Sequence, residues 1–304
     1  MVNITHKANT LRKAVAIARL DVSSQETIDA IQQRKVPKGD VFEFARAAGL
    51  LAIKKTSDVI PDCHPLPVEY AAITYEIEGL SVTITVEVHT IYKTGVEVEA
   101  MHGASITALV MYDMLKPIDK AIEIGTVRLA EKQGGKSGMK HYMPDEPSKC
   151  AVIVCSDSIS KGEKEDTAGL AIMEKLTPYA FDIAAYEVIP DELQQIQAKA
   201  KELVAEGYHL VIFTGGTGLS ERDVTPDAIA PLIDRDIPGI MEAARRYGQD
   251  RMPYAMLSRG VAGFMKDTLV LTLPGSKNGA IETMDALFPH ILHVFKVKAG
   301  MRHE

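Results

Sequence analysis

Hydrophobic and polar residues alternate in the first half of the chain in the way that is typical of a β-hairpin. From residue 82 to residue 88, valine or isoleucine occupies every second position within the run 81–92, which predicts a half-buried strand. A second β-rich run, residues 68–77, precedes it, and Glu78-Gly79 between the two runs predicts a turn. Residues 122–129 predict another strand.

Helical spacing of hydrophobic residues characterises the segments around this hairpin. Residues 41–55 predict a helix that the side chain of Asp40 can cap. Ser23-x-x-Glu26 resembles a capping box at the start of a shorter helix. Residues 98–119 predict a long helix rich in small residues. Helices packed on one face of an antiparallel sheet would make this half an α+β domain.

Strands and helices alternate regularly in the second half, which predicts an α/β domain of three layers with a mostly parallel sheet. In such a sheet, ligands bind at the carboxyl ends of the strands. The predicted strands are residues 150–155, 182–189, 209–213 and 268–273, and the predicted helices are residues 167–176, 192–206, 225–232 and 238–248.

A polar segment without periodicity, residues 138–149, separates these two patterns. It contains two prolines, and a strongly hydrophobic run follows it at once. We therefore predict two domains, residues 1–146 and residues 147–304, which agrees with a chain of 304 residues.

Composition places the chain among ordinary globular proteins, with 46% hydrophobic and 25% charged residues. No run approaches the roughly 18 apolar residues that a transmembrane helix needs, and the first residues lack the apolar core of a signal peptide. Cys63, Cys150 and Cys155 form neither a disulfide framework nor a zinc motif. We expect a cytoplasmic protein in a reducing compartment, without a membrane partner.

The net charge of −7 bears on which ligands can be expected to bind. Neither half is basic and aromatic residues are only 6% of the chain, so nucleic acid is not an expected partner. A small anionic ligand would have to be bound by local groups rather than attracted by the whole protein.

Candidate chemistry in the first half rests on pairs of charged residues. Asp113 and Lys116 are three positions apart on the predicted helix and so share a face, although a surface ion pair of little consequence has the same spacing. Glu97 and Glu99 point the same way if their segment is extended, which would also suit a solvated strand face.

Two further motifs offer groups that suit phosphate. His64 lies between Cys63 and Pro65, where an imidazole can act near neutral pH or simply fill a rigid turn. Lys136 lies within Gly134–Gly138, and glycines beside a lysine allow a phosphate to approach the backbone, although an ordinary loop has the same composition.

Together these motifs resemble the cyclic pyranopterin monophosphate synthase (MoaC) family over roughly residues 1–140. The most specific matches are Lys38-Gly-Asp-Val-Phe42, Cys63-His-Pro-Leu66, Thr94-Gly-Val-Glu97 and Gly134-Gly-Lys-Ser-Gly138. Asp62 departs from the family pattern, in which an apolar residue is usual. The resemblance implies a ferredoxin-like fold and an oligomer whose sites lie between subunits.

The activity that this resemblance implies is conversion of 3′,8-cyclo-7,8-dihydro-GTP into cyclic pyranopterin monophosphate, with release of pyrophosphate. Asp113 and Lys116 would be the central acid and base groups, and a crowded pocket would lower the pKa of the lysine. The remaining residues would bind substrate: Lys38, His64 and Lys136 at phosphate and pterin, Glu97 and Glu99 at the guanine-derived ring, and Cys63 beside them.

The strongest local signal in the second half is Thr214-Gly-Gly-Thr-Gly218, directly after a predicted strand. Glycines there let backbone N–H groups approach an anion, and Thr225-Pro226 suits a helix start, with the threonine as cap. An ordinary turn into a helix is the alternative. Polar loops after other strands, at Ser156-Asp157, Asp191 and Ser276, favour one shared cleft, although Asp191 also suits a helix cap.

These loops resemble the molybdopterin adenylyltransferase (MoaB/Mog) family over roughly residues 148–290. That resemblance implies a trimer that adenylylates molybdopterin with ATP and Mg²⁺ and holds no permanent cofactor. Asp191 and Asp223 would be the essential carboxylates and the Mg²⁺ ligands, because Mg²⁺ often takes one or two carboxylates plus phosphates. The groups that would bind substrate are Ser156, Asp157, Gly215, Gly216, Thr217, Gly218 and Ser276.

The two resemblances together predict a bifunctional enzyme of molybdenum cofactor biosynthesis. As an alternative, the second half could be a silent scaffold or oligomerisation module, since its family also occurs in the anchoring protein gephyrin. We expect a homo-oligomer, trimer or hexamer, and a molybdopterin synthase as a possible docking partner.

Overall fold

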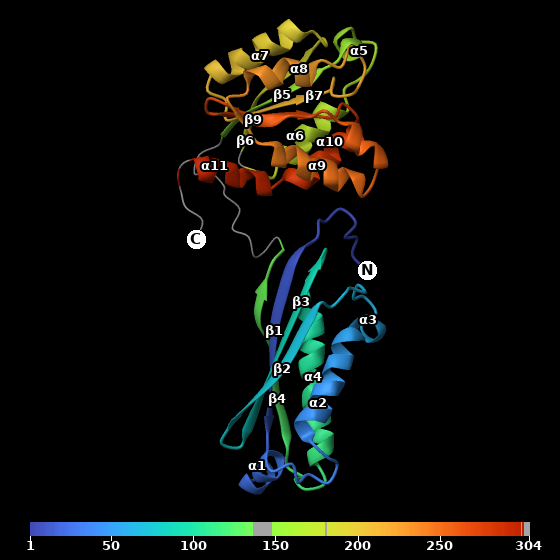
Figure 1. The fold of residues 1–304 in the computed structure, drawn as a ribbon, viewed down its shortest axis with the longest axis vertical. Coiled ribbons are helices and arrows are strands. Elements are labelled where there is room, and N and C mark those ends of the chain that lie inside the picture. The colour runs from blue at the N-terminus through green and yellow to red at the C-terminus, as the bar shows by residue number, and fades with distance from the viewer. Residues whose placement is uncertain (136–147, 180, 299, 301–304) are drawn as a thin grey trace. The chain divides into compact units, whose positions relative to one another are not determined.

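The computed structural model describes the chain except for residues 136–147, 180, 299 and 301–304 (Figure 1). The chain divides into two compact units, Met1–Lys140 and His141–Glu304. The boundary predicted near residue 146 lies outside the described residues and stays a prediction, as does any role of Lys136. None of the described helices is long and apolar enough to cross a membrane.

The first unit is a four-stranded antiparallel sheet with strand order β2-β3-β1-β4 and its main helices on one face (Figure 1). This arrangement agrees with the predicted α+β class. Its elements are β1 (Thr10–Asp21), α1 (Gln25–Gln32), α2 (Val41–Lys54), α3 (Thr56–Val59), β2 (Tyr70–Glu78), β3 (Ser81–Tyr92), α4 (Glu97–Leu115) and β4 (Glu123–Gln133).

The hydrophobic core of this unit lies between the sheet and the helices α2 and α4. The alternating residues Val82 to Val88 of β3 are completely buried, as the sequence pattern predicted. The two helices cross at glycines: a Cβ atom at Gly49 would lie 2.1 Å from Thr107 Oγ1, and one at Gly103 would lie 2.6 Å from Ile53. The small residues of α4 therefore allow the close approach of α2.

The sequence analysis missed the strand β1, which is central in the sheet, and two of its local predictions in this unit were wrong. The helix α4 begins at Glu97, so the segment that holds Glu97 and Glu99 is the first turn of a helix and not extended. Ser24 rather than Ser23 caps α1, whereas Asp40 caps α2 as predicted.

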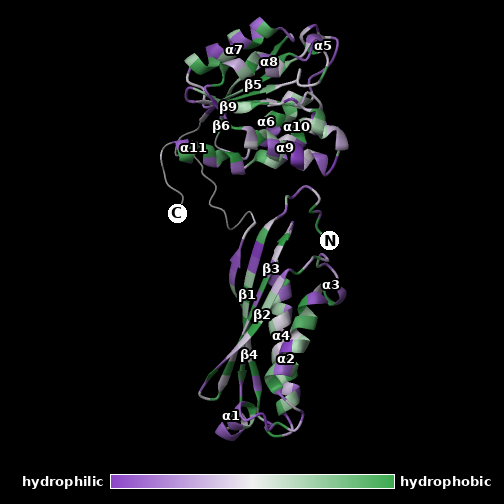
Figure 2. Cartoon of the chain, viewed as in Figure 1, coloured by the Kyte–Doolittle hydropathy of each residue, from purple (hydrophilic) through white to green (hydrophobic). Residues whose placement is uncertain are grey.

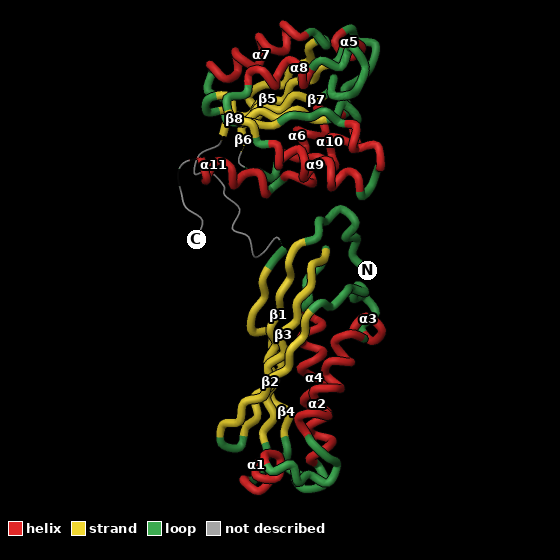
Figure 3. The backbone as a smooth tube through the Cα atoms, viewed as in Figure 1, coloured by secondary structure: helices red, strands yellow, loops and turns green. Residues whose placement is uncertain are grey.

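The second unit is a six-stranded sheet with strand order β6-β5-β7-β10-β9-β8 between two layers of helices (Figures 1 and 3). The four strands β6, β5, β7 and β10 pair in parallel, and β9 and β8 add antiparallel pairs. This confirms the predicted α/β class with a mostly parallel sheet. Figure 2 shows that hydrophobic residues gather on its strands, and β5 and β7 are almost fully buried.

The elements of this unit reach beyond those predicted, mainly after residue 248. They are β5 (Ser148–Cys155), α5 (Asp157–Ser160), α6 (Ala168–Leu176), β6 (Phe181–Ile189), α7 (Leu193–Ala205), β7 (Leu210–Thr214), α8 (Thr225–Ile229), η1 (Ala230–Leu232), β8 (Arg235–Asp236), α9 (Pro238–Gln249), η2 (Pro253–Leu257), β9 (Ala262–Met265), β10 (Thr268–Leu273), α10 (Lys277–Leu287), η3 (His290–Leu292) and α11 (His293–Lys298).

Two capping predictions for the second unit were also wrong. Thr225 is the first residue of α8, and Val224 precedes it as the cap. Asp191 does not cap α7, because Glu192 holds that position and makes no side-chain capping bond. The side chain of Asp191 is therefore available for another role.

Asp119 is a buried carboxylate that ties α1 to the segment after α4. It accepts hydrogen bonds from Ser23 N–H and Ser23 Oγ, each at 2.7 Å, from Thr27 Oγ1 at 3.1 Å and from Ala121 N–H at 3.0 Å. Burial alone would raise the pKa of Asp119, but these hydrogen bonds outweigh burial and lower it. Its charged form therefore stabilises the fold.

We predict that Asp119→Ala lowers the free energy of unfolding of the first unit by roughly 3 kcal/mol at pH 7, because it leaves the hydrogen-bond donors around Asp119 without their acceptor. Because the pKa of Asp119 is lowered, its contribution is present above the ordinary aspartate pKa of about 3.9 and is lost as the pH falls below that value. Hydrogen exchange of the α1 amides at pH 7 and at acid pH measures both effects. An equal loss of protection at both pH values would contradict the role of the charge.

Candidate active sites

Asp113, near the C-terminal end of α4, lies between two lysines. Its carboxylate oxygens are 2.7 Å from Lys38 Nζ and 2.6 Å from Lys116 Nζ, and Lys38 Nζ also donates to the Asp113 carbonyl at 2.9 Å. The hydrogen bonds from Lys116 and Lys38 lower the pKa of Asp113 to about 2. The sequence prediction that Asp113 and Lys116 share a face is confirmed, and Lys38 joins them.

The predicted lowering of the Lys116 pKa does not occur in this chain. The hydrogen bond to Asp113 raises the pKa of Lys116, and half of its side chain is exposed. A lysine pKa falls only where burial or neighbouring cations outweigh such a partner, so this single chain does not bury Lys116 in the crowded pocket that the prediction assumed.

A second group of predicted residues lies at the N-terminal end of α4. Glu99 is only 3% exposed, and its Oε1 accepts a hydrogen bond from Cys63 Sγ at 3.4 Å. Its Oε2 is buried without a partner in the described part of the chain. Burial raises the pKa of Glu99 and that of Cys63, the latter to about 11. Glu97 is more exposed and lies 3.5 Å from Lys132 Nζ.

The two groups are too far apart to form one pocket within a single chain. Glu99 and Asp113 are 14 positions apart on the same helix, which at 1.5 Å per residue is about 21 Å. His64 donates to or accepts from no site residue in the described structure, and its Nε2 lies 2.8 Å from the carbonyl oxygen of Val2. The structure therefore does not bring all the predicted residues of the first half together.

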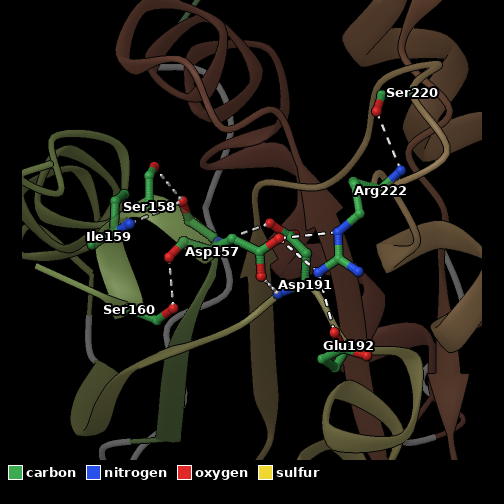
Figure 4. A network of polar contacts seen from close by, with 9 residues as sticks. Asp157, Ser158, Ile159, Ser160, Asp191, Glu192, Ser220 and Arg222 are labelled. Atoms are coloured by element: carbon green, nitrogen blue, oxygen red, sulfur yellow. Dashed lines mark hydrogen bonds and ion pairs between the residues drawn. The ribbon is translucent and has the colours of Figure 1, made fainter. Parts of the chain in front are cut away.

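In the second unit, the loops after β5 and β6 meet at the carboxyl ends of the parallel strands (Figure 4). Asp157 N–H donates to Asp191 Oδ2 at 3.0 Å, and Asp191 N–H donates to Asp157 Oδ1 at 3.2 Å. Ser156 Oγ caps the short helix α5 through Ile159 N–H. The predicted meeting of these residues at one sheet edge is confirmed.

Arg222, which the sequence analysis did not single out, joins Asp157 of this pair to the carboxylate of Glu192. Its Nη2 lies 2.6 Å from Asp157 Oδ2 and 3.1 Å from Glu192 Oε1, and its Nε lies 3.0 Å from Asp157 Oδ2 (Figure 4). The hydrogen bond from Arg222 lowers the pKa of Asp157. These partners are 30 and 65 residues away in the sequence, so no local motif marks the interaction.

The glycine loop after β7 fits closely against its neighbours. Gly215 has a φ of 100°, and a Cβ atom there would lie 2.1 Å from the carbonyl oxygen of Cys155. A Cβ atom at Gly275 would in turn lie 2.9 Å from Gly215 Cα. Only glycines allow these loops to touch, which also places Ser276, the cap of α10, beside the loop.

The next residues of this loop present backbone N–H groups. Those of Gly216, Thr217 and Gly218 donate to no acceptor in the described part of the chain. A Cβ atom at Gly218 would lie 2.9 Å from Asp223 Oδ2, which itself accepts a hydrogen bond from Ser220 N–H at 2.9 Å. Successive free N–H groups of this kind suit an anion such as a phosphate.

Arg259 is a second residue that sequence reasoning missed, and it fixes this loop. Its backbone N–H donates to Thr217 at 3.1 Å, its Nε to the Gly218 carbonyl at 2.7 Å, and its Nη2 to the Asp223 carbonyl. Its Nη1 pairs with Asp227 at 2.9 Å. The guanidinium of Arg259 thus joins Gly218, Asp223 and Asp227, and its backbone adds the bond to Thr217.

The donor groups near Asp191 suit a divalent cation. Asp191 Oδ1 is buried without a partner among the described residues and lies against Gly216. Burial raises the pKa of Asp191, and the charges of Asp157 and Asp223 add to this. Within the described ranges no three acidic, histidine or cysteine side chains form a ready metal cluster. Such a site fits Mg²⁺ that takes one or two carboxylates and completes its shell with phosphates.

A cavity of about 560 Å³ adjoins the loop after β10, a volume within the usual range for small-molecule sites. Helix α9, η2 and the start of α10 form its walls, and three basic residues, Arg245, Arg251 and Lys277, line it. Ser276 is the predicted site residue that reaches it.

Comparison with known proteins divides the chain as its two units do. The MoaC family model matches residues 1–135, and the model described as a probable molybdopterin binding domain matches residues 151–293. A cyclic pyranopterin monophosphate synthase of Pelobacter propionicus is 50% identical over 141 residues, which are 46% of this chain and 88% of that protein.

Two proteins match along the whole length. A molybdenum cofactor biosynthesis bifunctional protein of Chlorobaculum tepidum is 39% identical and covers 100% of this chain and 96% of its own length. One of Synechococcus elongatus with the same description is 38% identical over 100% of this chain and 98% of its own. The chain therefore belongs to the family of bifunctional molybdenum cofactor biosynthesis proteins, with a MoaC domain followed by a MoaB-like domain.

Proposed function

We propose that the first half converts 3′,8-cyclo-7,8-dihydro-GTP into cyclic pyranopterin monophosphate and pyrophosphate, and that the second half adenylylates molybdopterin with ATP and Mg²⁺. The observation that carries the proposal is the full-length match to fused relatives. The structure adds support, because the carboxylates, lysines and glycine loop that each reaction would use are present and grouped.

The first half would work as an oligomer with sites between subunits. Its two groups of candidate residues lie about 21 Å apart along α4, so a second copy would bring the Asp113 group of one chain to the Glu99 group of another. The outer faces of α2 and α4 support this, since Phe44, Leu51 and Leu109 are more than half exposed. We propose a trimer or hexamer on the same grounds, and a ferredoxin-like fold because the antiparallel sheet has the order β2-β3-β1-β4 with its main helices on one face.

In such a site the lysine pair would bind the phosphates and donate protons. Asp113 holds the Nζ atoms of Lys38 and Lys116 on either side of its carboxylate, and two lysines placed together suit general-acid catalysis and neutralisation of a departing pyrophosphate. Glu99 is buried, and one of its oxygens has no partner in the described ranges of the chain. It would accept hydrogen bonds from the N–H donors of the pterin ring.

In the second half, the backbone N–H groups of residues 216–218 would bind the phosphates of ATP. The adjacent 560 Å³ cavity would hold molybdopterin, with its basic side chains near the anionic phosphate. Asp191 and Asp223 would hold Mg²⁺, which supplies charge stabilisation for nucleotidyl transfer when it is bound. Arg259 would keep the loop in place during the reaction.

A silent scaffold is the alternative for the second half. A scaffold has no use for Asp191 Oδ1, which is buried at an energetic cost without a partner among the residues that the structure describes. That cost is typical of a functional site, so the enzyme is the better supported function. Cyclisation of the GTP derivative and ATP-dependent adenylylation of molybdopterin, assayed on one preparation, test the two activities directly.

We predict that Lys116→Ala lowers the rate of pyranopterin formation by about 10²–10⁴-fold, as expected for a general acid or base. Adenylylation by the same protein should stay unchanged. Lys120→Ala, which removes an exposed lysine just beyond α4, is the matched control. Unchanged cyclisation in Lys116→Ala would mean that Asp113 and Lys116 are only a surface ion pair.

We predict that Asp223→Asn and Asp191→Asn each lower adenylylation by about 10²-fold or more, since each keeps the shape and removes a charge for Mg²⁺. Asp182→Asn on the edge strand β6 is the control. Normal turnover at saturating Mg²⁺ would remove the substituted residue from the mechanism.

Asp191→Asn should also stabilise the second unit without ligand, by roughly 1 kcal/mol or about 2–4 °C. Because the pKa of Asp191 is raised, its charged form destabilises the fold, and this cost appears as the pH rises from acid to neutral. Calorimetry at neutral and acid pH should show the gain only at neutral pH. A lower melting temperature at neutral pH would show that Asp191 is structural.

We predict that the halves 1–146 and 147–304, expressed separately, each keep near-normal activity, because each unit has its own core. Any benefit of the fusion should appear only when a sulfur-inserting molybdopterin synthase is present as a docking partner. Comparing fused and split proteins with and without that synthase measures this. Inactive isolated halves would show that contacts between the units build the sites.

A further inference from the structure

Arg222 stands out among the charged groups of the second unit because it neutralises carboxylates that border the proposed Mg²⁺ site. Its guanidinium binds Asp157 through two nitrogens, at 2.6 and 3.0 Å, and reaches Glu192 at 3.1 Å. Asp157 and Asp191 in turn each donate a backbone N–H to the carboxylate of the other. A cation that approaches Asp191 therefore meets a site that already contains a positive charge (Figure 4).

The position of Arg222 allows it to leave these partners. Its side chain is 57% exposed, and exposed ion pairs contribute little net stability. It follows Gly218 by four residues, on the loop whose N–H groups at residues 216–218 donate to no acceptor in the described part of the chain. Arginine is also well suited to bind phosphate through two nitrogens, so a triphosphate on this loop would be an alternative partner for the same guanidinium.

We propose that Arg222 is an exchangeable counter-ion that contacts ATP during the reaction. Without nucleotide it occupies Asp157 and Glu192 and disfavours a lone divalent cation at Asp191. When a metal–triphosphate complex binds, the guanidinium of Arg222 moves to the phosphates. The metal then replaces it as the positive charge beside the carboxylates. The site then selects metal and nucleotide together over metal alone. This inference rests on the proposed adenylyltransferase function.

The test is the binding of two probes to the full-length protein: Mn²⁺ alone, followed by electron paramagnetic resonance, and a non-hydrolysable ATP analogue with Mn²⁺, followed by calorimetry. For Arg222→Met we expect Mn²⁺ alone to bind about three- to tenfold more tightly, because the competing charge is gone. The same variant should bind the ATP analogue at least about tenfold more weakly, because the phosphates lose a bidentate partner.

Two variants make the comparison specific. Arg235→Met removes an exposed arginine on β8 and should change neither affinity. Arg222→Lys keeps the charge and loses the planar fork, so Mn²⁺ alone should bind within about twofold of the wild type while the analogue binds more weakly. An increase in Mn²⁺ affinity with lysine equal to that with methionine would overturn the role of charge.

The proposal predicts that Arg222→Met raises the affinity for Mn²⁺ alone and lowers the affinity for the ATP analogue. Structural damage would lower both affinities. Unchanged or weaker Mn²⁺ binding in Arg222→Met, or unchanged binding of the analogue, overturns the proposal. If Arg222→Met shows these opposite changes in affinity but the wild-type protein does not adenylylate molybdopterin, the exchange stands and only the proposed reaction is contradicted.

Discussion

The hydrogen bonds and positive charges around each carboxylate determine whether it stabilises the fold or remains able to bind a ligand. Asp119 accepts four hydrogen bonds in the interior and has no capacity left, so it stabilises the fold. Asp113 is held between two lysines at the surface. Glu99 and Asp191 each bury one oxygen without a partner among the described residues. Because such burial is costly, these two positions indicate where a ligand would complete the structure.

The rigidity of α4 imposes a second constraint on the first unit. The helix is 19 residues long and separates Asp113 from Glu99 by about 21 Å. No side-chain movement closes such a distance. If both groups serve one reaction, they must come from different chains, and the exposed apolar residues of α2 and α4 offer the surface for that assembly. The small residues at the helix crossing, Gly49 and Gly103, keep these helices in one fixed arrangement.

The sequence predicted elements with strong periodicity and residues within short motifs. The alternation of β3 and the hydrophobic β5 and β7 were clear signals. Strand β1 was missed because alanines at 14, 16 and 18 fill its buried face, which gives little hydrophobic contrast. The helical start at Glu97 lacks a capping side chain and so leaves no local signal. Arg222 and Arg259 act on partners 30 to 65 residues away, which only the fold brings close.

The second unit also shows why a strained loop and an uncompensated charge occur together. Gly215 and Gly275 allow the loops after β7 and β10 to touch, and this contact places Gly216 against the unpaired oxygen of Asp191. A bulkier loop would fill the space beside this carboxylate. The glycines therefore leave space beside a buried carboxylate that lowers the stability of the fold. Binding of the proposed cation and triphosphate there would offset this cost.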